Sequence, residues 1–186
     1  MRRTALFDFS KHVHHGDEIN QKRSFFHYVV ASWIRSNPKK FMEIAKKYKS
    51  WIWLEGEPVF IQMEWRHPKT FLFYDMYMKV WAPYRNIPDK FRYYHVFIEI
   101  KTGKYNDAWL EQLRKEYNNK NSGKLTYKYE DTVVQLLFIA RKSEISKLRQ
   151  NLASYPTGYL LFFELDYLES YIQHDLKAIV AKMLTW

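Results

Sequence analysis

Two carboxylates and a lysine are spaced along the middle of the chain in a way that suits metal-assisted chemistry. The stretch FIEIKTGKYNDAWLEQLRKEY, residues 97–117, begins as an apolar strand that carries Glu99 and Lys101, and Asp75 lies on the preceding strand. Side chains alternate along a strand, so Glu99 and Lys101 share one of its faces. If the two strands pair antiparallel, Asp75 at the start of one lies across from Glu99 at the end of the other.

Two carboxylates that meet at one sheet edge repel each other, so the pair implies a cation between them. Hard oxygen ligands and a phosphate substrate favour Mg²⁺ or Mn²⁺. Such a metal lowers the pKa of a bound water and neutralises charge that grows on a phosphate, while Lys101 positions or deprotonates the water. The chemistry indicated is hydrolysis of a phosphodiester.

The elements that must position these residues follow from the apolar periodicity and the turn residues. We expect helices over 17–34 and 39–50, strands over 50–66, 70–82 and 92–101, a loop over 83–91, and a helix ending near 117, followed by a strand over 131–140, a helix over 143–155, a strand over 158–165 and a helix over 166–184. Helices that alternate with strands predict an α/β layer fold with a mixed sheet. The apolar runs at 131–140 and 158–165 do not alternate, which favours strands covered on both faces.

The composition favours one domain with an affinity for polyanions. The 186 residues are 47% hydrophobic and 19% aromatic, which is enough for a single sizeable core. A net charge of +10 favours nucleic acid or an acidic membrane surface as partner. The absence of cysteine excludes disulfides, thiolate zinc sites and a cysteine nucleophile, and no complete glycine-rich phosphate loop is present.

The chain contains no segment that predicts a membrane span or a secretory signal. No apolar run approaches the roughly 18 residues that a span needs, and the basic start MRRTALFDFSKHVHH is not followed by an apolar region. We therefore expect a cytoplasmic protein without a membrane partner.

Asp75 followed by Glu99-Ile100-Lys101 resembles the PD-(D/E)xK nuclease superfamily, and EIKTG with a later QLRKEY looks like its RecB-type branch. The resemblance implies a restriction-endonuclease-like α-β-β-β-α-β core over about 17–140 with a mixed sheet, and a C-terminal helix-strand-helix extension over about 141–186. It also implies that Asp75, Glu99 and the Ile100 carbonyl bind Mg²⁺ or Mn²⁺, that Lys101 activates water, and that Gln112 contacts the lysine, the water or the DNA. The expected activity is metal-dependent cleavage of single-stranded, duplex or branched DNA.

The sequence departs from that family at several points. Tyr117 lies five residues after Gln112 instead of four, so no role is carried over to it. The literal Pro-Asp at 88–89 leaves too few residues before Glu99 for two strands and a turn. For the additional acidic residue on a first helix, Glu18 and Glu43 compete, and we favour Glu18. The wealth of charged and aromatic residues without cysteine would suit a thermophile or its virus, so an archaeal virus or a mobile element is the expected source.

Each of these residues also has a simpler interpretation. Glu99 and Lys101 can form a cross-strand salt bridge, Asp75 can cap a strand start, and Gln112 can be a solvated helix residue. Two further hypotheses for the whole chain are a catalytically inactive nucleic-acid-binding protein with the same fold and a purely structural interaction protein.

Histidines and basic residues supply weaker candidates. HVHHGDE at 12–18 has the side chains of a transition-metal site, whereas His27 and His174 are best explained as helix-surface or core residues, and His95 shares the strand face of Glu99. Several cations suit a phosphate-tracking surface: Lys39, Lys40, Lys46, Lys47, Lys49, Arg85, Lys90 and Arg92. Tyr84 and Phe91 beside them could stack on bases. The apolar face of the last helix covers either the sheet or a second subunit, which leaves a homodimer open.

Overall fold

The computed structural model describes residues 18–67, 72–84, 87–121, 132–152 and 160–183. The elements are α1 (Glu18–Ser36), α2 (Pro38–Lys46), η2 (Ile52–Glu55), β1 (Glu57–Arg66), β2 (Phe73–Tyr84), β3 (Ile87–Lys101), α3 (Asp107–Asn121), β4 (Thr132–Ala140), α4 (Lys142–Asn151), β5 (Leu160–Glu164) and α5 (Asp166–Met183). The predicted order of helices and strands is confirmed, including the helix-strand-helix at the C-terminal end.

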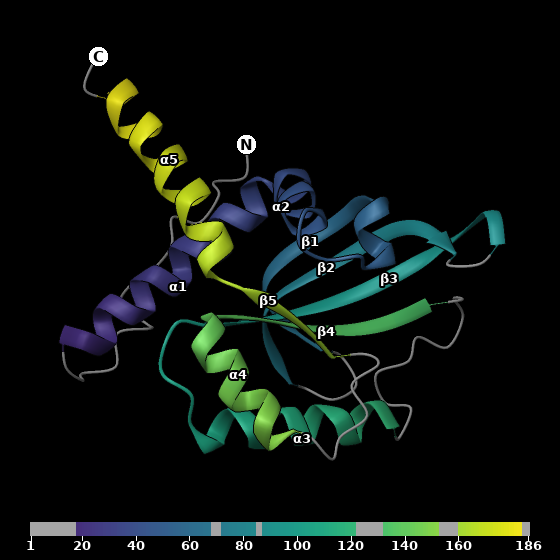
Figure 1. The fold of residues 1–186 in the computed structure, drawn as a ribbon. Helices are drawn as coiled ribbons and strands as arrows, with labels where there is room; N and C mark the ends of the chain where they lie inside the picture. The colour runs from purple at the N-terminus through teal and green to yellow at the C-terminus, as the bar shows by residue number, and fades with distance from the viewer. Residues whose placement is uncertain (1–17, 68–71, 85–86, 122–131, 153–159, 184–186) are drawn as a thin grey trace.

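The five strands form one mixed sheet in the order β1-β2-β3-β4-β5 (Figure 1). Strands β1, β2 and β3 are antiparallel neighbours, while β4 lies parallel to β3 and β5 lies parallel to β4. The α/β class with a mixed sheet is therefore confirmed. In the β2–β3 ladder Met76 lies opposite Ile98, so Asp75 and Glu99 occupy the next position along the same register.

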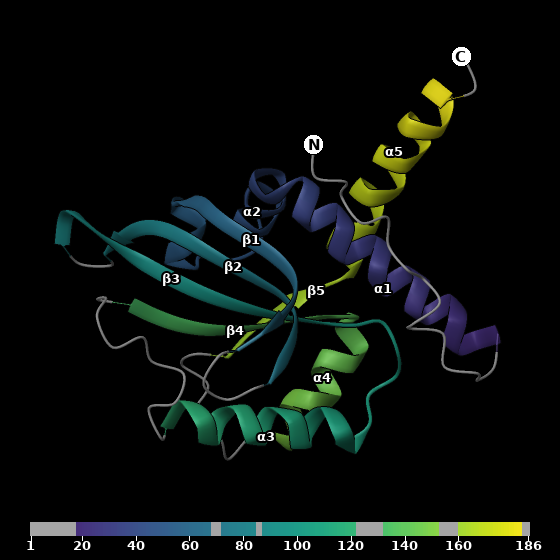
Figure 2. The same cartoon turned by 180° about the vertical axis from the view of Figure 1, so that it is seen from behind.

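Helices cover both faces of the sheet, and each face has its own apolar core (Figures 1 and 2). Residues of α1, α2, η2 and α5 pack against one face, where Met76, Val96 and Ile98 are fully buried. Residues of α3 and α4 pack against the other, where Phe138 is fully buried. Strands β4 and β5 contribute to both cores, as their unbroken apolar runs predicted.

The expected loop over 83–91 is wrong, because β2 continues to Tyr84 and β3 begins at Ile87. Neighbouring strands stop short of this region: β1 begins at Glu57, opposite Trp81, and β4 begins opposite Tyr93. Residues 83–84 and 87–92 therefore form a two-stranded arm that no other described strand flanks. Proline is tolerated there because an outer edge needs no ladder N–H.

The expected strand over 50–66 also begins later, since Ile52–Glu55 is a 3₁₀ turn. Trp53 and Leu54 are neighbours in the sequence and are both buried in the same core, whereas an alternating strand would have put them on opposite faces. Gly56 ends the turn against β2, and a Cβ at this position would lie 2.3 Å from the Trp81 carbonyl oxygen and 2.5 Å from the Ala82 Cβ. Glycine is required here by lack of space.

The first half of α5 covers the sheet, and its second half runs away from the body (Figures 1 and 2). Leu168 and Ile172 are buried in the core. Asp175 then joins three helices, since its carboxylate accepts hydrogen bonds from Trp33 Nε1 at 2.9 Å and from Lys40 Nζ at 2.7 Å. In the described parts of the chain, no helix combines the length and the apolar character that crossing a membrane requires.

Gly56→Ala tests the contact between the 3₁₀ turn and β2. The new methyl group overlaps backbone atoms, so we expect the free energy of unfolding to fall by about 1–3 kcal/mol in urea denaturation. Gly103→Ala is the matched control, since a Cβ there meets nothing within 4 Å. Equal stability of the two variants would contradict the packing at Gly56.

Candidate functional site

Asp75 lies at the start of β2 with its side chain turned toward β3. The carboxylate Oδ2 accepts a hydrogen bond of 2.6 Å from the backbone amide of Ile100. Ile100 stands between Glu99 and Lys101, so this bond joins the Asp75 side chain to the backbone between the other two predicted residues. The register places Asp75 across from Glu99, as predicted, but the two carboxylates contact different side chains, His27 for Asp75 and Lys101 for Glu99.

The alternation of side chains along β2 breaks beside Asp75. Tyr74 and Tyr77, three residues apart, pack in the core under α3 and α4, while Met76 packs in the opposite core. The break coincides with Glu64 on β1, which stands at the matching register position and has a φ of 51°. A positive φ at a non-glycine residue is uncommon and marks local strain. Asp75 is thereby turned toward α1 instead of sharing the face of Tyr77.

His27 of α1 completes the surroundings of Asp75, and the sequence interpretation missed it. Its Nε2 lies 3.3 Å from Asp75 Oδ1, and its Nδ1 lies 3.0 Å from the carbonyl oxygen of Ile100. His27 precedes the buried residues Val30 and Ala31 by three and four positions, so it shares their face of the helix. That spacing was the signal available in the sequence.

Glu99, Lys101 and Gln112 form a connected group on the α3 side of the same strand end. Lys101 Nζ donates to Glu99 Oε2 at 2.9 Å and to Gln112 Oε1 at 3.0 Å. Glu99 is 2% exposed, and its Oε1 is buried without a hydrogen-bond partner among the described residues. Gln112 reaches the group because Trp109 and Leu113, one helical turn apart, bury this face of α3.

The electrostatic state of Glu99 is dominated by its burial. Burial and then the charge of Asp75 raise the pKa of Glu99 from 4.5 to about 7, and the Lys101 ammonium offsets only part of the rise. A carboxyl group with such a pKa exchanges its proton near neutral pH. Glu99 therefore gives up its proton and becomes charged readily when a cation approaches.

Asp75 and His27 form an ion pair. Burial by itself would raise the pKa of Asp75, but the hydrogen bond and charge of His27, followed by the charge of Lys101, lower it. Burial would likewise lower the pKa of His27, but the hydrogen bond and charge of Asp75, with the Ile100 carbonyl, raise it. Asp75 thus stays ionised while Glu99 holds a proton more readily.

Several features of this group suit a divalent cation. The 3.3 Å between His27 Nε2 and Asp75 Oδ1 is near the separation of about 3 Å expected for two ligands that are each about 2.1 Å from one ion. The Ile100 carbonyl fixes the His27 ring through Nδ1, a contact typical of metal-binding histidines. Within the described residues, no set of three His, Asp or Glu side chains is arranged as a ready metal site. The site therefore consists of His27 and Asp75 as a pair of potential ligands. Near them lies Glu99, whose Oε1 has no hydrogen-bond partner within bonding distance among the described residues.

The remaining predicted residues lie elsewhere. Glu18 opens α1, but its side chain, like the 12–18 histidine segment before it, falls outside what the structure describes. Glu43 is exposed on α2. Buried His95 is hydrogen-bonded through Nδ1 to the Tyr77 hydroxyl at 2.7 Å, and the side chain of His174 is 83% exposed. Both fit the simpler interpretation.

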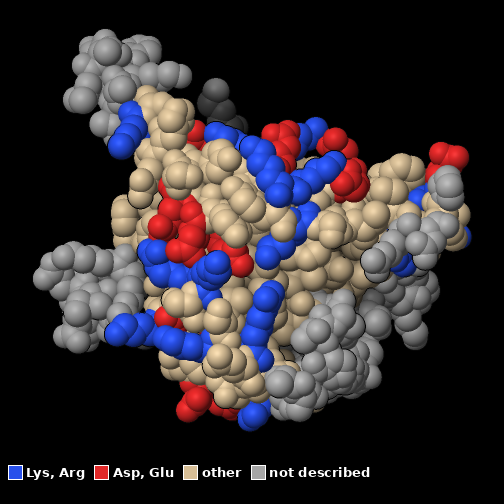
Figure 3. Space-filling view, viewed as in Figure 1, with Lys and Arg blue, Asp and Glu red and all other residues tan. Residues whose placement is uncertain are grey.

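The lysines of α2 are mostly paired with acidic residues of neighbouring elements. Lys39 pairs with Glu57, Lys40 with Asp175 and Lys46 with Glu55, and just after the helix Lys47 lies over the Tyr171 ring and Lys49 pairs with Glu164. Figure 3 shows blue and red side chains interspersed on this side of the molecule. Exposed pairs of this kind contribute little stability and leave no continuous basic track over α2. Arg85 lies outside the described residues.

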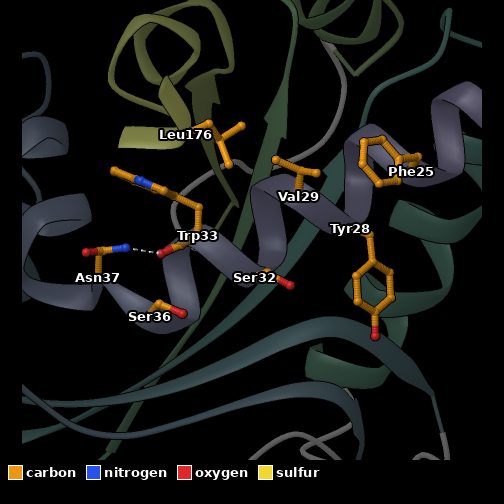
Figure 4. Close-up of a pocket in the computed structure, with 8 residues that line it drawn as sticks. All are labelled: Phe25, Tyr28, Val29, Ser32, Trp33, Ser36, Asn37 and Leu176. Carbon is orange, nitrogen blue, oxygen red and sulfur yellow. Dashed lines mark hydrogen bonds between the residues drawn. The ribbon is translucent and has the colours of Figure 1, made fainter. Parts of the chain in front are cut away.

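A separate cavity of about 320 Å³ lies between α1 and α5 (Figure 4). Val29, Trp33 and Leu176 line it with other apolar, hydroxyl and amide side chains, and Phe25 at its border is 61% exposed. None of the lining residues is charged, so the cavity offers no counter-charge to a phosphate or a metal ion.

The chain matches no protein-family model, no curated protein and no solved structure.

The pH dependence of stability tests the state of Glu99. Its folded pKa is raised from 4.5 to about 7, so its protonated form favours folding. This stabilisation is complete below about pH 4.5 and is lost as the pH rises through 7. The shift corresponds to a loss on the order of 3 kcal/mol in metal-free protein. Urea denaturation in chelator across this range measures it.

Glu99→Gln should remove that loss, because the amide does not titrate. His27, whose raised pKa gives a loss in the same direction, is present in both proteins and cancels in the comparison. Glu111→Gln, at an exposed site on α3, is the control and should keep the slope. An unchanged pH profile in Glu99→Gln would show that Glu99 does not carry the shifted proton.

Proposed function

We propose that this protein is a divalent-metal-dependent nuclease that hydrolyses DNA phosphodiester bonds at the His27–Asp75–Glu99–Lys101 group. One observation carries the proposal: the Ile100 amide binds the Asp75 carboxylate, which puts an ionised acid beside an acid-lysine pair at the end of one strand. A structural salt bridge between Glu99 and Lys101 alone would need neither Asp75 nor Gln112 nearby.

The architecture supports the same assignment. Two helices and an antiparallel β1-β2-β3 meander are followed by α3 and by β4 parallel to β3, as in a restriction-endonuclease-like α-β-β-β-α-β core. The predicted acids stand at the start of β2 and the end of β3, the positions that the PD-(D/E)xK resemblance assigns to them. On this proposal α4, β5 and α5 are the extension.

On this proposal His27 and Asp75 would hold the metal ion, and Glu99 would join them by a side-chain movement, since the three are not arranged as a ready site. The Ile100 carbonyl, which accepts from His27 Nδ1, would orient that ring. Bound Mg²⁺ or Mn²⁺ would neutralise charge on the phosphate and lower the pKa of a coordinated water. Oε1 of Glu99 is the buried oxygen whose missing partner such an ion would supply. Because Glu99 has a pKa of about 7, its proton leaves at modest cost when a cation approaches.

The chain's own residues then handle the substrate and the water. Lys101 is held by two fixed acceptors, Glu99 Oε2 and Gln112 Oε1, so its ammonium is oriented before any substrate arrives. In that position it orients the attacking water and stabilises negative charge on the phosphate. Gln112 positions Lys101 from α3 and is expected to affect rate through that contact.

A second candidate is a nucleic-acid-binding protein with this fold and no catalysis. It is favoured by the absence, among the described side chains, of a ready three-ligand metal site and by the bond that occupies Glu99 Oε2. DNA binding in chelator without cleavage in Mg²⁺ or Mn²⁺ would select it. If no DNA is bound even at low salt, where charge-driven binding is strongest, a structural interaction protein is left.

Substitutions at three residues test the nuclease assignment directly. Asp75→Asn, Glu99→Gln and Lys101→Met should each lower the cleavage rate at least about 100-fold, because each removes charge from the reacting centre. The assay uses labelled single-stranded, duplex, flap and four-way DNA with Mg²⁺, Mn²⁺ or chelator. Glu111→Gln, next to Gln112 on α3, is the control with unchanged cleavage. Full activity of Glu99→Gln would refute the assignment.

His27→Ala tests metal binding apart from cleavage. We expect the variant to bind Mn²⁺ about 10- to 100-fold more weakly in calorimetry, because it loses a ligand and frees Asp75 from its fixed position. His174→Ala removes an exposed histidine and should bind as before. Equal Mn²⁺ affinity of His27→Ala and the unchanged protein would exclude His27 as a ligand.

A further inference from the structure

The arm formed by β2 and β3 has a row of aromatic side chains on one face. Trp81 lies opposite Tyr93 in the ladder, with ring centroids 4.6 Å apart, and Phe91 stacks on Trp81 at 5.9 Å with ring planes 17° apart. Phe60 of β1, opposite Lys79, lies on the same face. We call Phe60, Lys79, Trp81, Phe91 and Tyr93 the aromatic platform.

The platform is exposed, unlike the rest of the same strand face. Phe60 and Phe91 are 45% exposed and Trp81 is 39% exposed, whereas Phe97 further along β3 is 1% exposed under the core of α3 and α4. Large aromatic side chains that lie side by side in water are unusual on a surface and mark an interaction site.

Positive charge accompanies the exposed rings. Lys79 Nζ lies 3.7 Å from the centre of the Tyr93 ring, on the platform itself. Arg92 and Lys90 lie over Tyr84, at 4.1 and 5.1 Å, on the reverse face of the same two strands, where Arg92 also lies over Tyr94. The carboxylate of Glu57, in register with Trp81, is bound to Lys39 Nζ at 2.6 Å. Lys79 is thus the cation of the platform face, and Lys90 and Arg92 add positive charge on the reverse face.

We infer that the aromatic platform binds an unpaired DNA strand by stacking its bases on the exposed rings of Trp81 and Phe91, with Lys79 beside them, and Lys90 and Arg92 on the reverse face, attracting its phosphates. Exposed rings with positive charge nearby match single-stranded nucleic acid, since unpaired bases offer a ring face and the backbone offers negative charge. A duplex presents phosphates to such a surface, but its bases are already stacked on each other.

The inference deepens the proposed function, because it rests on DNA being the substrate and specifies the unpaired strand as the part recognised. Glu99 lies six positions after Tyr93 on β3, which is about 20 Å along an extended strand. The platform therefore holds the DNA away from the proposed site of cleavage. A substrate with an unpaired strand of several nucleotides is the class that would engage both.

Binding of a labelled 20-nucleotide oligo(dT), followed by fluorescence anisotropy in chelator, tests the platform without depending on cleavage. We expect tighter binding of oligo(dT) than of a blunt hairpin duplex with the same number of phosphates. Trp81→Ala and Phe91→Ala should each weaken oligo(dT) binding about tenfold or more. Trp81→Phe should retain most of the binding, because a ring remains. Phe25→Ala, which removes an exposed aromatic side chain from α1, should bind as the unchanged protein does.

Other results would overturn the inference. These are unchanged oligo(dT) affinity in both alanine variants that retain the native circular dichroism spectrum, equal affinity for oligo(dT) and duplex, or a loss of self-association in Trp81→Ala, which would assign the platform to a second copy of the chain. Platform-dependent binding without cleavage would refute the nuclease and leave the platform standing. Cleavage that does not depend on Trp81 or Phe91 would refute the platform as a DNA-binding surface and leave the nuclease assignment standing.

Discussion

The hydrogen bond from the Ile100 amide to the Asp75 carboxylate is the contact on which the arrangement of the candidate site depends. A backbone donor at the end of β3 determines where the carboxylate from β2 lies, and His27 from α1 meets the same carboxylate from the other side. Without this bond, no backbone group of β3 would hold the Asp75 carboxylate next to Glu99. The local break in strand alternation near Glu64 accompanies it, and such breaks are often retained where a side chain must be re-aimed.

The two acids at the site are held in different protonation states by their surroundings. Asp75 is paired with a cation and a backbone amide, so its charge is stabilised, whereas Glu99 is buried, and Lys101 and Gln112 offset only part of the cost of its charge. Because the pKa of Asp75 is lowered and that of Glu99 is raised, Asp75 stays an anion while Glu99 changes its protonation when a cation binds. The cost of burying Glu99 is hard to explain by a structural salt bridge alone, because a buried acid-lysine pair gives weak net stabilisation.

The surface divides into regions of different character. Charges over α2 are largely neutralised in pairs, the cavity between α1 and α5 is mostly apolar, and β2 and β3 carry exposed Trp81 and Phe91 with cations on neighbouring tyrosine rings. Net positive charge alone would not separate these regions. Their difference comes from which side chains the sheet register brings together, since Trp81 meets Tyr93 only through the β2–β3 ladder.

The sequence alone determined the α/β class, the order of the elements and the grouping of Asp75, Glu99, Lys101 and Gln112, because these depend on local periodicity, on strand alternation and on a family resemblance carried by nearby residues. Tertiary structure decided the rest. The involvement of His27 depends on how α1 crosses the sheet, which no local pattern encodes. Residues 83–84 and 87–92 are extended although their prolines predicted a loop, because no other described strand flanks them and a missing N–H on an outer edge costs little. The raised pKa of Glu99 likewise required the folded surroundings, since burial is a property of the packed chain and of no single segment.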